Sequence, residues 1–261
     1  MRTIAIANQK GGSGKTTTAF NVSGALAKAG QRVLLIDLDP QMSLSRDALG
    51  VRTPTGPSLS SVLMSSRGNL GRLVQSTAFE GIDVVAGDEE LQAIELQMGR
   101  TTAREMLLRR AFQRLFGRAE GAPNYDFVLI DVPPSLGFLY ANAINCATEV
   151  ILPVNLSLLS MSALERTLRS IAVARGESNY DLRVLGILIG NVKGRTAYHR
   201  EAEKSLREQF GDSVFRTVIA SSIVVEEAIH AKLPISGYAP SSAIARAYRD
   251  VAREIVARGT T

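Results

Sequence analysis

Runs of apolar, often β-branched residues alternate along the chain with segments whose apolar positions recur at helical spacing. This alternation is typical of a parallel sheet whose strands are buried on both faces by helices. The sequence therefore predicts an α/β sandwich, with a mainly parallel central sheet flanked by helices on both faces, in one domain spanning residues 1–261. The predicted strands are Thr3–Asn8, Arg32–Asp37, Ile82–Ala86, Phe127–Asp131, Glu149–Val154 and Val184–Gly190.

The first and last helices have recognisable limits. Thr16–Ala29 has helical period and ends near Gly30, where a glycine takes the left-handed turn that closes a helix. A last helix is predicted over Ser242–Ala257. From Leu44 to Gly81 the chain is rich in Ser, Gly and Arg and has only short apolar repeats such as Leu59–Met64. We expect this stretch to be an irregular, mobile excursion next to the site.

Composition then narrows the class of protein. The chain has 261 residues, 45% of them hydrophobic, which suffices for one large core. It contains no run of about 18 apolar residues that would span a bilayer, and its first strand begins almost at Met1, so we expect a cytoplasmic protein without stable membrane insertion. The single cysteine, Cys146, excludes an internal disulfide and a multi-cysteine metal site within one chain, and we expect it to be an inert core residue. The net charge of +5 favours contact with an acidic polymer only weakly.

The first strand runs into a glycine-rich turn and then into a helix that opens at Lys15. Glycines let backbone N–H groups converge on phosphate oxygens, and the helix N-terminus adds the positive end of its dipole. Lys15 is placed to reach the β and γ phosphates of a nucleotide, and the Thr16 hydroxyl to ligate Mg²⁺. A glycine-rich turn that binds nothing is the less favoured interpretation. The predicted phosphate-binding residues are Gly11, Gly12, Ser13, Gly14, Lys15, Thr16 and Thr17.

This loop departs from the ordinary phosphate-binding pattern G-x-x-x-x-G-K-[ST], which would place a glycine at position 9. The chain has Gln9 there and a second lysine, Lys10, at the front of the loop. It matches K-G-G-x-G-K-[ST] and so resembles the ParA/MinD family of deviant Walker A P-loop ATPases. The resemblance implies a P-loop NTPase fold, ATP and Mg²⁺ as cofactors, and a Lys10 that reaches the nucleotide of a second subunit across a two-fold interface. A solvated surface lysine is the alternative.

Two of the predicted strands lead into acidic residues. Asp37 ends the second predicted strand, Asp39 follows it, and Asp131 ends the strand that precedes a Pro-Pro pair. Ligands of open α/β sheets bind outside the carboxyl ends of the strands, where carboxylates suit Mg²⁺. Asp131 is therefore predicted to hold Mg²⁺ as in a Walker B strand, and Asp37 to help through water. The resemblance implies that Asp39 orients the attacking water, which makes it catalytic together with Lys10 and Lys15. Capping of the following turn is the alternative role for the first two carboxylates.

The resemblance continues from Thr3 to about Ala257. Segments ending at Asn191 and around Pro234 look like those that lie near the base in the family, so these two residues are predicted adenine contacts, with ordinary loop chemistry as an equally good interpretation. Because no helix-turn-helix domain precedes the P-loop, the chain is similar to the short form of ParA-type partition ATPases.

The resemblance implies a working cycle. ATP would join two subunits into a homodimer, the dimer would bind DNA without sequence preference, and a ParB-like partner would stimulate otherwise slow hydrolysis, so that plasmid or chromosome DNA is positioned on the nucleoid. Such DNA binding needs Lys and Arg side chains near phosphates. Basic residues recur at helical spacing on two predicted helix faces, but interleaved acidic residues make salt-bridged, solvated faces the alternative. The DNA-binding candidates are Lys193, Arg195, Arg200, Lys204, Arg207, Arg246, Arg249 and Arg253.

One segment departs from the family. Many relatives carry Ile-Pro-Arg with another arginine shortly after, whereas this chain has Ala220, Ser221 and Val224 at those positions, so either the basic surface has moved or the cargo and track differ. A MinD-like ATPase that positions a non-DNA cargo or acts at a membrane surface is the alternative function, disfavoured because the tail from Val251 has few large apolar residues. A reductase of the nitrogenase iron-protein type needs two cysteines per subunit, which disagrees with the lone Cys146. A binding module without ATPase activity is disfavoured by the intact catalytic residues.

Overall fold

The computed structural model describes residues 1–53, 56–65, 67–97, 104–117, 124–194 and 196–259. Its centre is a seven-stranded sheet in the order β3-β4-β2-β5-β1-β6-β7, in which every pairing is parallel except that of β3 with β4. The prediction of a mainly parallel α/β sheet is confirmed. The strands are β1 (Arg2–Ile6), β2 (Val33–Asp37), β3 (Val74–Ser76), β4 (Ile82–Val85), β5 (Phe127–Asp131), β6 (Glu149–Val154) and β7 (Arg183–Ile189).

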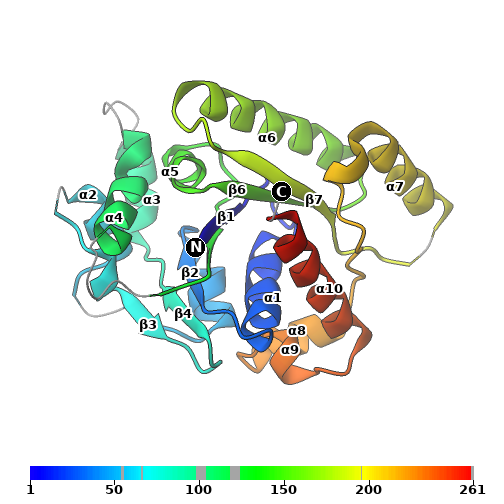
Figure 1. The fold of residues 1–261 in the computed structure, drawn as a ribbon, viewed down its shortest axis with the longest axis horizontal. Helices are drawn as coiled ribbons and strands as arrows, with labels where there is room; N and C mark the ends of the chain where they lie inside the picture. Colours follow the sequence, from blue (N-terminus) through cyan, green and yellow to red (C-terminus); the bar gives the residue numbers. More distant parts are fainter. Residues whose placement is uncertain (54–55, 66, 98–103, 118–123, 195, 260–261) are drawn as a thin grey trace.

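Helices cover both faces of this sheet (Figure 1). Successive side chains of a strand point to opposite faces, so each strand feeds two separate cores. Ile4 and Ile6 of β1 pack in the core beneath α1, α8, α9 and α10, while Ala5 and Ala7 pack in the core beneath α2 to α7. The helices are α1 (Lys15–Lys28), α2 (Leu59–Met64), α3 (Glu90–Gln97), α4 (Leu107–Phe116), α5 (Phe138–Cys146), α6 (Leu158–Glu177), α7 (Ala197–Phe210), α8 (Ile223–His230), α9 (Ile235–Tyr238) and α10 (Ala243–Arg258).

The predicted elements agree closely with the observed ones. The strands over 127–131 and 149–154 match the prediction, and the other predicted strands differ from β1, β2, β4 and β7 by one or two residues at one or both ends. Gly30 has a φ of 83° directly after α1, as expected for a glycine that closes a helix. Among the described residues no helix has both the length and the apolar character that a bilayer crossing would require.

The expectation of an irregular excursion between Leu44 and Gly81 was wrong in one respect. The described part of this stretch contains a π-helical turn η1 (Ser43–Ala48), the helix α2 and the antiparallel edge strand β3. Leu44, Leu63 and Leu70 are fully buried in it. The apolar repeats are short because each of these elements is short, and β3 extends the sheet beyond β4.

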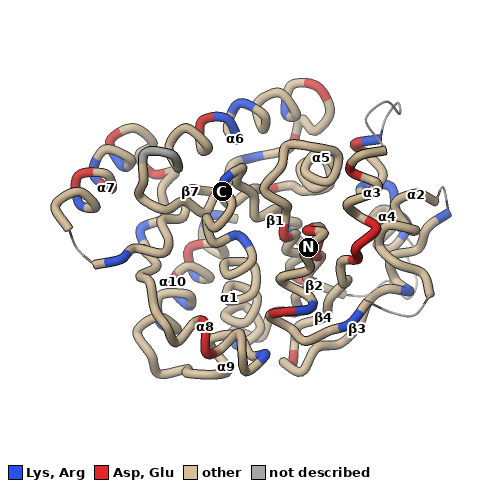
Figure 2. Tube along the Cα trace, turned by 180° about the vertical axis from the view of Figure 1, so that it is seen from behind, with Lys and Arg blue, Asp and Glu red and all other residues tan. Residues whose placement is uncertain are grey.

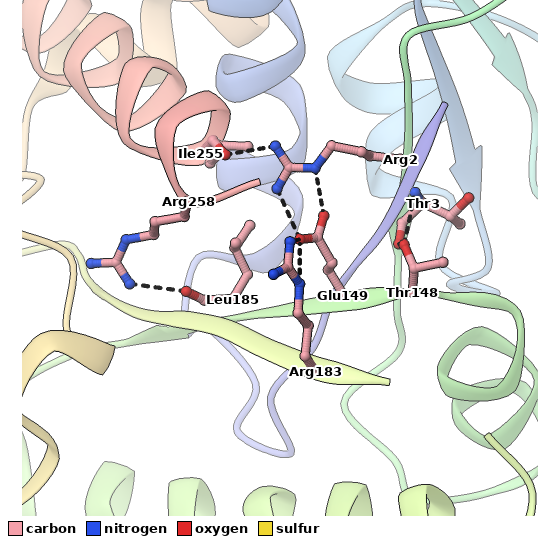
Figure 3. A network of polar contacts seen from close by, with 8 residues as sticks. All are labelled: Arg2, Thr3, Thr148, Glu149, Arg183, Leu185, Ile255 and Arg258. Carbon is pink, nitrogen blue, oxygen red and sulfur yellow. Dashed lines mark hydrogen bonds and ion pairs between the residues drawn. The ribbon is translucent and has the colours of Figure 1, made fainter. Parts of the chain in front are cut away.

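A buried carboxylate ties the other end of the sheet together. The Glu149 side chain, 3% exposed, accepts hydrogen bonds from Arg2 of β1 and Arg183 of β7 (Figure 3). Arg2 also donates to the Ile255 carbonyl oxygen of α10 at 2.6 Å. A buried charge is tolerated when it is paired and hydrogen-bonded, as Glu149 is here. This network fixes the starts of three strands against the last helix, and it leaves the opposite, carboxyl edge of the sheet to form a site.

Candidate functional site

The loop between β1 and α1 is an open cradle of backbone groups. Gly12 and Gly14 have φ values of 69° and 91°, which favour glycine over residues with a Cβ. A Cβ placed on Gly11, Gly12 or Gly14 would meet no described heavy atom within 4 Å. Gly14 is also the N-cap of α1 and has no side chain to satisfy the first N–H groups of the helix. The geometry therefore leaves these donors and the positive helix end for an anion.

Lys15 lies under this loop with 7% of its surface exposed. Its ammonium donates a long hydrogen bond of 3.4 Å to the Lys10 carbonyl oxygen. Burial lowers the pKa of Lys15, and the nearby charges of Asp131 and Asp39 oppose that shift. The side chain is thus a cation held between the cradle and two carboxylates, with only one weak hydrogen bond to the loop.

Lys10 contacts hydroxyl groups of its own chain in this structure. Its ammonium donates to the Ser157 and Ser160 hydroxyls at 2.8 and 2.9 Å, at the start of α6 in the same chain. Its backbone N–H donates to Asn8 Oδ1 at 3.0 Å. The contact with the nucleotide of a second subunit stays a prediction, and the structure adds that Lys10 must leave two hydroxyl groups to make it. Ser157 and Ser160 carry no sequence signal for this role, because they lie 147 and 150 residues away along the chain.

Asp37 and Asp131 are direct neighbours in the parallel pairing of β2 with β5, and both are fully buried. Asp37 Oδ2 accepts hydrogen bonds from the Ser45 backbone and hydroxyl at 2.8 and 2.7 Å, and its Oδ1 accepts one from Asp39 N at 3.1 Å. Burial raises the pKa of Asp37 to about 6 despite these bonds. In this structure Asp37 anchors the loop that follows β2, so its predicted role at the metal would be additional.

Asp131 has a different environment. Neither of its carboxylate oxygens has a hydrogen-bond partner of normal geometry among the residues that the structure describes. Burial and the charge of Asp37 raise the pKa of Asp131 well above its usual range, whereas the nearby Thr16 hydroxyl and Lys15 act in the opposite direction. A buried carboxylate with so little hydrogen bonding is costly to the fold, and groups with strongly shifted pKa values cluster at sites that bind or react.

This environment fits Mg²⁺ held together with a phosphate. In the described part of the chain no group of three or more His, Cys, Asp or Glu side chains could hold a metal ion by itself. Mg²⁺ does not need one, because it is usually bound through one or two carboxylates plus the phosphates of the substrate. The Asp131 carboxylate and the adjacent Thr16 hydroxyl are suited to this role, and their contact with Mg²⁺ stays a prediction.

Asp39 lies in the turn after β2 and is half-buried. Its Oδ1 accepts a hydrogen bond from Gln41 N at 3.0 Å, so it also caps this turn. The capping role that the sequence left open is therefore present, and the orientation of an attacking water stays a prediction for the same side chain.

A hollow of about 230 Å³ adjoins the glycine-rich loop. Asn191, in a left-handed conformation with φ 53°, lines it together with Ser221 and Ile219. Pro234 does not: it packs against Gly24 of α1. Ala220 and Ser221, which stand where many relatives have Pro and Arg, line this hollow. The sequence related these two positions only to a DNA-binding surface.

The DNA-binding candidates lie on α7, on α10 and in the loop before α7, and acidic residues are interspersed with them along both helices (Figure 2). Lys204, Arg207 and Arg253 pair with acidic residues of their own helices. Arg246 and Arg249 donate to the Ser241 and Pro240 carbonyl oxygens and cap the loop before α10. Lys193 and Arg200 are exposed, and Arg195 lies outside the described residues. The salt-bridged alternative therefore applies to several candidates, and their role toward DNA stays a prediction.

The lone cysteine is placed as expected. Cys146 is a free thiol at the end of α5, 8% exposed. Burial raises the pKa of its thiol to about 12, so the reactive thiolate is scarce at neutral pH.

Comparisons with known proteins agree with this geometry. A family described as "AAA domain" matches residues 1–184. The chain is similar to the chromosome partitioning protein ParA of Caulobacter vibrioides, with 38% identity over 259 residues that cover 99% of this chain and 95% of the relative.

Two solved structures have the same architecture. The cobyrinic acid a,c-diamide synthase of Mycobacterium smegmatis, with bound ADP and magnesium, has a TM-score of 0.82 at 30% identity and covers 100% of this chain and 96% of its own. The cell division ATPase MinD of Pyrococcus furiosus has a TM-score of 0.77 at 28% identity and covers 98% of each chain.

The extent of the match to relatives, the sequence of the glycine-rich loop and the fold all indicate the same family. The relatives are matched over nearly their whole length, and the deviant loop with two lysines is the feature that places the chain within the P-loop ATPases. The chain belongs to the ParA/MinD family of deviant Walker A P-loop ATPases and is a ParA-type partition ATPase.

Proposed function

We propose that this chain is an ATP-dependent, dimerising switch that binds DNA non-specifically and segregates or positions plasmid or chromosome DNA with a ParB-like partner, in the cytoplasm and on the nucleoid. One observation carries the proposal: a second lysine, Lys10, stands at the front of a phosphate cradle and is held there by hydrogen bonds to two neutral hydroxyl groups of its own chain. One domain over residues 1–261 would carry the whole cycle.

Each residue of the site has a role in this proposal. Mg²⁺ would neutralise charge on the phosphates of ATP, with Asp131 and Thr16 as the protein's ligands. Lys15 and the first N–H groups of α1 bind and orient the β and γ phosphates. Asp39 orients a water for hydrolysis. Turnover by one subunit alone is slow, since few preorganised groups stabilise the charge of the transition state. The partner would raise this rate.

Release of the dimer follows from the same contacts. When the γ phosphate leaves, Lys10 loses its anionic partner and returns to the hydroxyl groups of its own α6, and the loop anchored on Asp37 loses a neighbouring contact. DNA binding would then end because it depends on the paired basic surfaces of two subunits.

The relative from Caulobacter vibrioides is named a chromosome partitioning protein, which supports DNA as what the dimer of this chain binds. The ion pairs on α7 and α10 support a second candidate: an ATPase of this family that positions a non-DNA cargo or acts at a membrane surface. The two candidates share the nucleotide switch and differ only in what the dimer binds.

The test is DNA binding by the purified protein with ATP, with ADP and without nucleotide, over a series of salt concentrations, together with its mass in solution. We expect ATP alone to produce a dimer with salt-sensitive, sequence-independent DNA binding. Lys10→Ala should abolish both, and Lys28→Ala, at the other end of the same helix as Lys15, should change neither. A dimer that ignores DNA would favour the second candidate, which binding to liposomes would then examine.

A further inference from the structure

The loop that follows Asp131 is braced by a carboxylate from another helix. Residues 132–137 connect the end of β5 to α5. Glu95 of α3 accepts hydrogen bonds from the Ser135 hydroxyl at 3.1 Å, through Oε1, and from the Leu139 backbone N–H at 2.8 Å, through Oε2. One side chain thus contacts both the loop and the first turn of α5.

The local sequence of α5 explains why a carboxylate is needed there. The N-cap of α5 is Gly137, which has no side chain to accept from the free N–H groups of the first turn. Glu95 supplies the missing acceptor from α3, and its negative charge lies at the positive end of the α5 dipole. The contact is therefore a helix cap made across 44 residues of sequence.

Gly137 is also required for close approach. A Cβ at this position would lie 1.7 Å from Glu95 Oε1, so any other residue would displace the carboxylate. The φ of Gly137 is −87°, which any residue adopts, so the glycine serves the contact and not the backbone conformation.

The loop is stiff between this brace and the nucleotide site. Pro133 and Pro134 have fixed φ angles, and each restricts the residue before it to extended conformations. Asp131 itself is tied to the neighbouring strand end by the hydrogen bond from Leu38 N to its carbonyl oxygen, at 3.0 Å. A displacement at Ser135 is therefore transmitted through a short, rigid segment to Asp131, whose buried carboxylate has few other contacts to hold it.

We propose that Glu95 is a positioning residue for the magnesium-binding end of the nucleotide site, because it holds the Pro133–Gly137 loop and the start of α5 and so fixes how Asp131 is presented. This inference rests on the proposed function as an ATPase that uses Mg²⁺. Residues that orient a metal ligand without touching the metal commonly change metal affinity by about 10-fold or more when they are removed.

The experiment measures equilibrium binding of a fluorescent ADP analogue to the full chain, with Mg²⁺ at several concentrations and with EDTA. We expect Glu95→Ala and Gly137→Ala to lower the apparent Mg²⁺ affinity by about tenfold while binding in EDTA stays unchanged. Glu95→Gln should lie between these and the wild type, because its amide oxygen still accepts from Leu139 N without the charge. Glu90→Gln, the same change at an exposed position of α3, is the matched control.

The outcomes separate this inference from the proposed function. Wild-type Mg²⁺ dependence in both Glu95→Ala and Gly137→Ala would overturn the positioning role, and so would an equal loss of binding with Mg²⁺ and with EDTA, since that indicates a loosened fold. A wild-type protein whose nucleotide binding ignores Mg²⁺ would overturn both proposals. Gly137→Ala keeps the test decisive if Glu95→Ala fails to fold.

Discussion

The ammonium group of Lys10 lies 2.9 Å from the Ser160 hydroxyl of its own chain, and 2.8 Å from that of Ser157, the N-cap of α6. A cation near the start of a helix is opposed by the helix dipole, by about 0.3–1 kcal/mol at exposed positions. The two hydroxyl hydrogen bonds offset this repulsion but do not neutralise the lysine. The partners of Lys10 are therefore neutral hydroxyl groups, which an anionic phosphate can readily replace.

The first prediction concerns this docked state. Changing Ser157 and Ser160 together to Ala should remove both acceptors and shift the ATP-bound protein toward the dimer, so that dimers form at a lower protein concentration. Sedimentation with ATP measures the shift. Ser178→Ala, at the far end of α6, is the control. An unchanged or weakened dimer would show that the two serines do not compete with the second subunit for Lys10.

The second prediction concerns Asp131, whose buried carboxylate has no partner of normal geometry in the described part of the chain. Asp131→Asn should stabilise the protein without Mg²⁺ by about 1–2 kcal/mol at neutral pH, because the charged form is disfavoured by burial and by Asp37. The same change should abolish the Mg²⁺ dependence of nucleotide binding. Urea unfolding in EDTA measures the first effect, and a loss of stability would contradict it.

A third prediction follows from the left-handed conformation of Gly14, with φ 91°. Gly14→Ala should destabilise the fold by about 1–2 kcal/mol. It should also place a methyl group in the open cradle, so the loss in free energy of nucleotide binding should exceed the loss in free energy of unfolding. Gly176→Ala is a control with the opposite expected sign. This glycine lies in α6 with open space around it, so the substitution should raise the free energy of unfolding by about 0.5–1 kcal/mol. Similar effects of the two changes on urea unfolding would contradict the prediction.

The fourth prediction is a pH dependence of stability from Glu254 of α10. Burial alone would raise the pKa of Glu254, but hydrogen bonds from Thr217 and Arg216 and the charge of Arg258 lower it below its ordinary value of 4.5. The unfolded chain then binds this proton more readily than the native one, so the stabilisation is present above about pH 4.5 and is lost as the pH falls through the native pKa.

Glu254→Gln should accordingly reduce the thermal midpoint at about pH 6 and have a smaller effect near pH 3. Thermal unfolding of both proteins across this range is the measurement. An effect of Glu254→Gln that does not depend on pH would mean that the side chain acts through its shape and not through its charge.

The strands, the glycine-rich loop and the strand-end carboxylates could be predicted because a few consecutive residues determine each of them. Buried β-branched runs fix strand positions to within one or two residues, and the cradle needs its glycines at fixed spacing. Ser157 and Glu95 could not be predicted, since their contacts join residues 147 and 44 positions apart. The adenine contact of Pro234 stays a prediction; the structure adds that this proline packs against Gly24 of α1, a contact that the long intervening sequence hides.

Asp37 and Asp131 occupy the same rung of the ladder between β2 and β5. The separation of their backbones is consequently set by main-chain hydrogen bonding, whereas contacts with the surrounding loops orient their side chains. Ser45 belongs to the loop that contacts this pair, through its two hydrogen bonds to Asp37. The main chain at this edge of the sheet is thus a fixed reference, and a loop that shifts when nucleotide binds, such as the one that holds Ser45, moves relative to the backbone of Asp37 and Asp131.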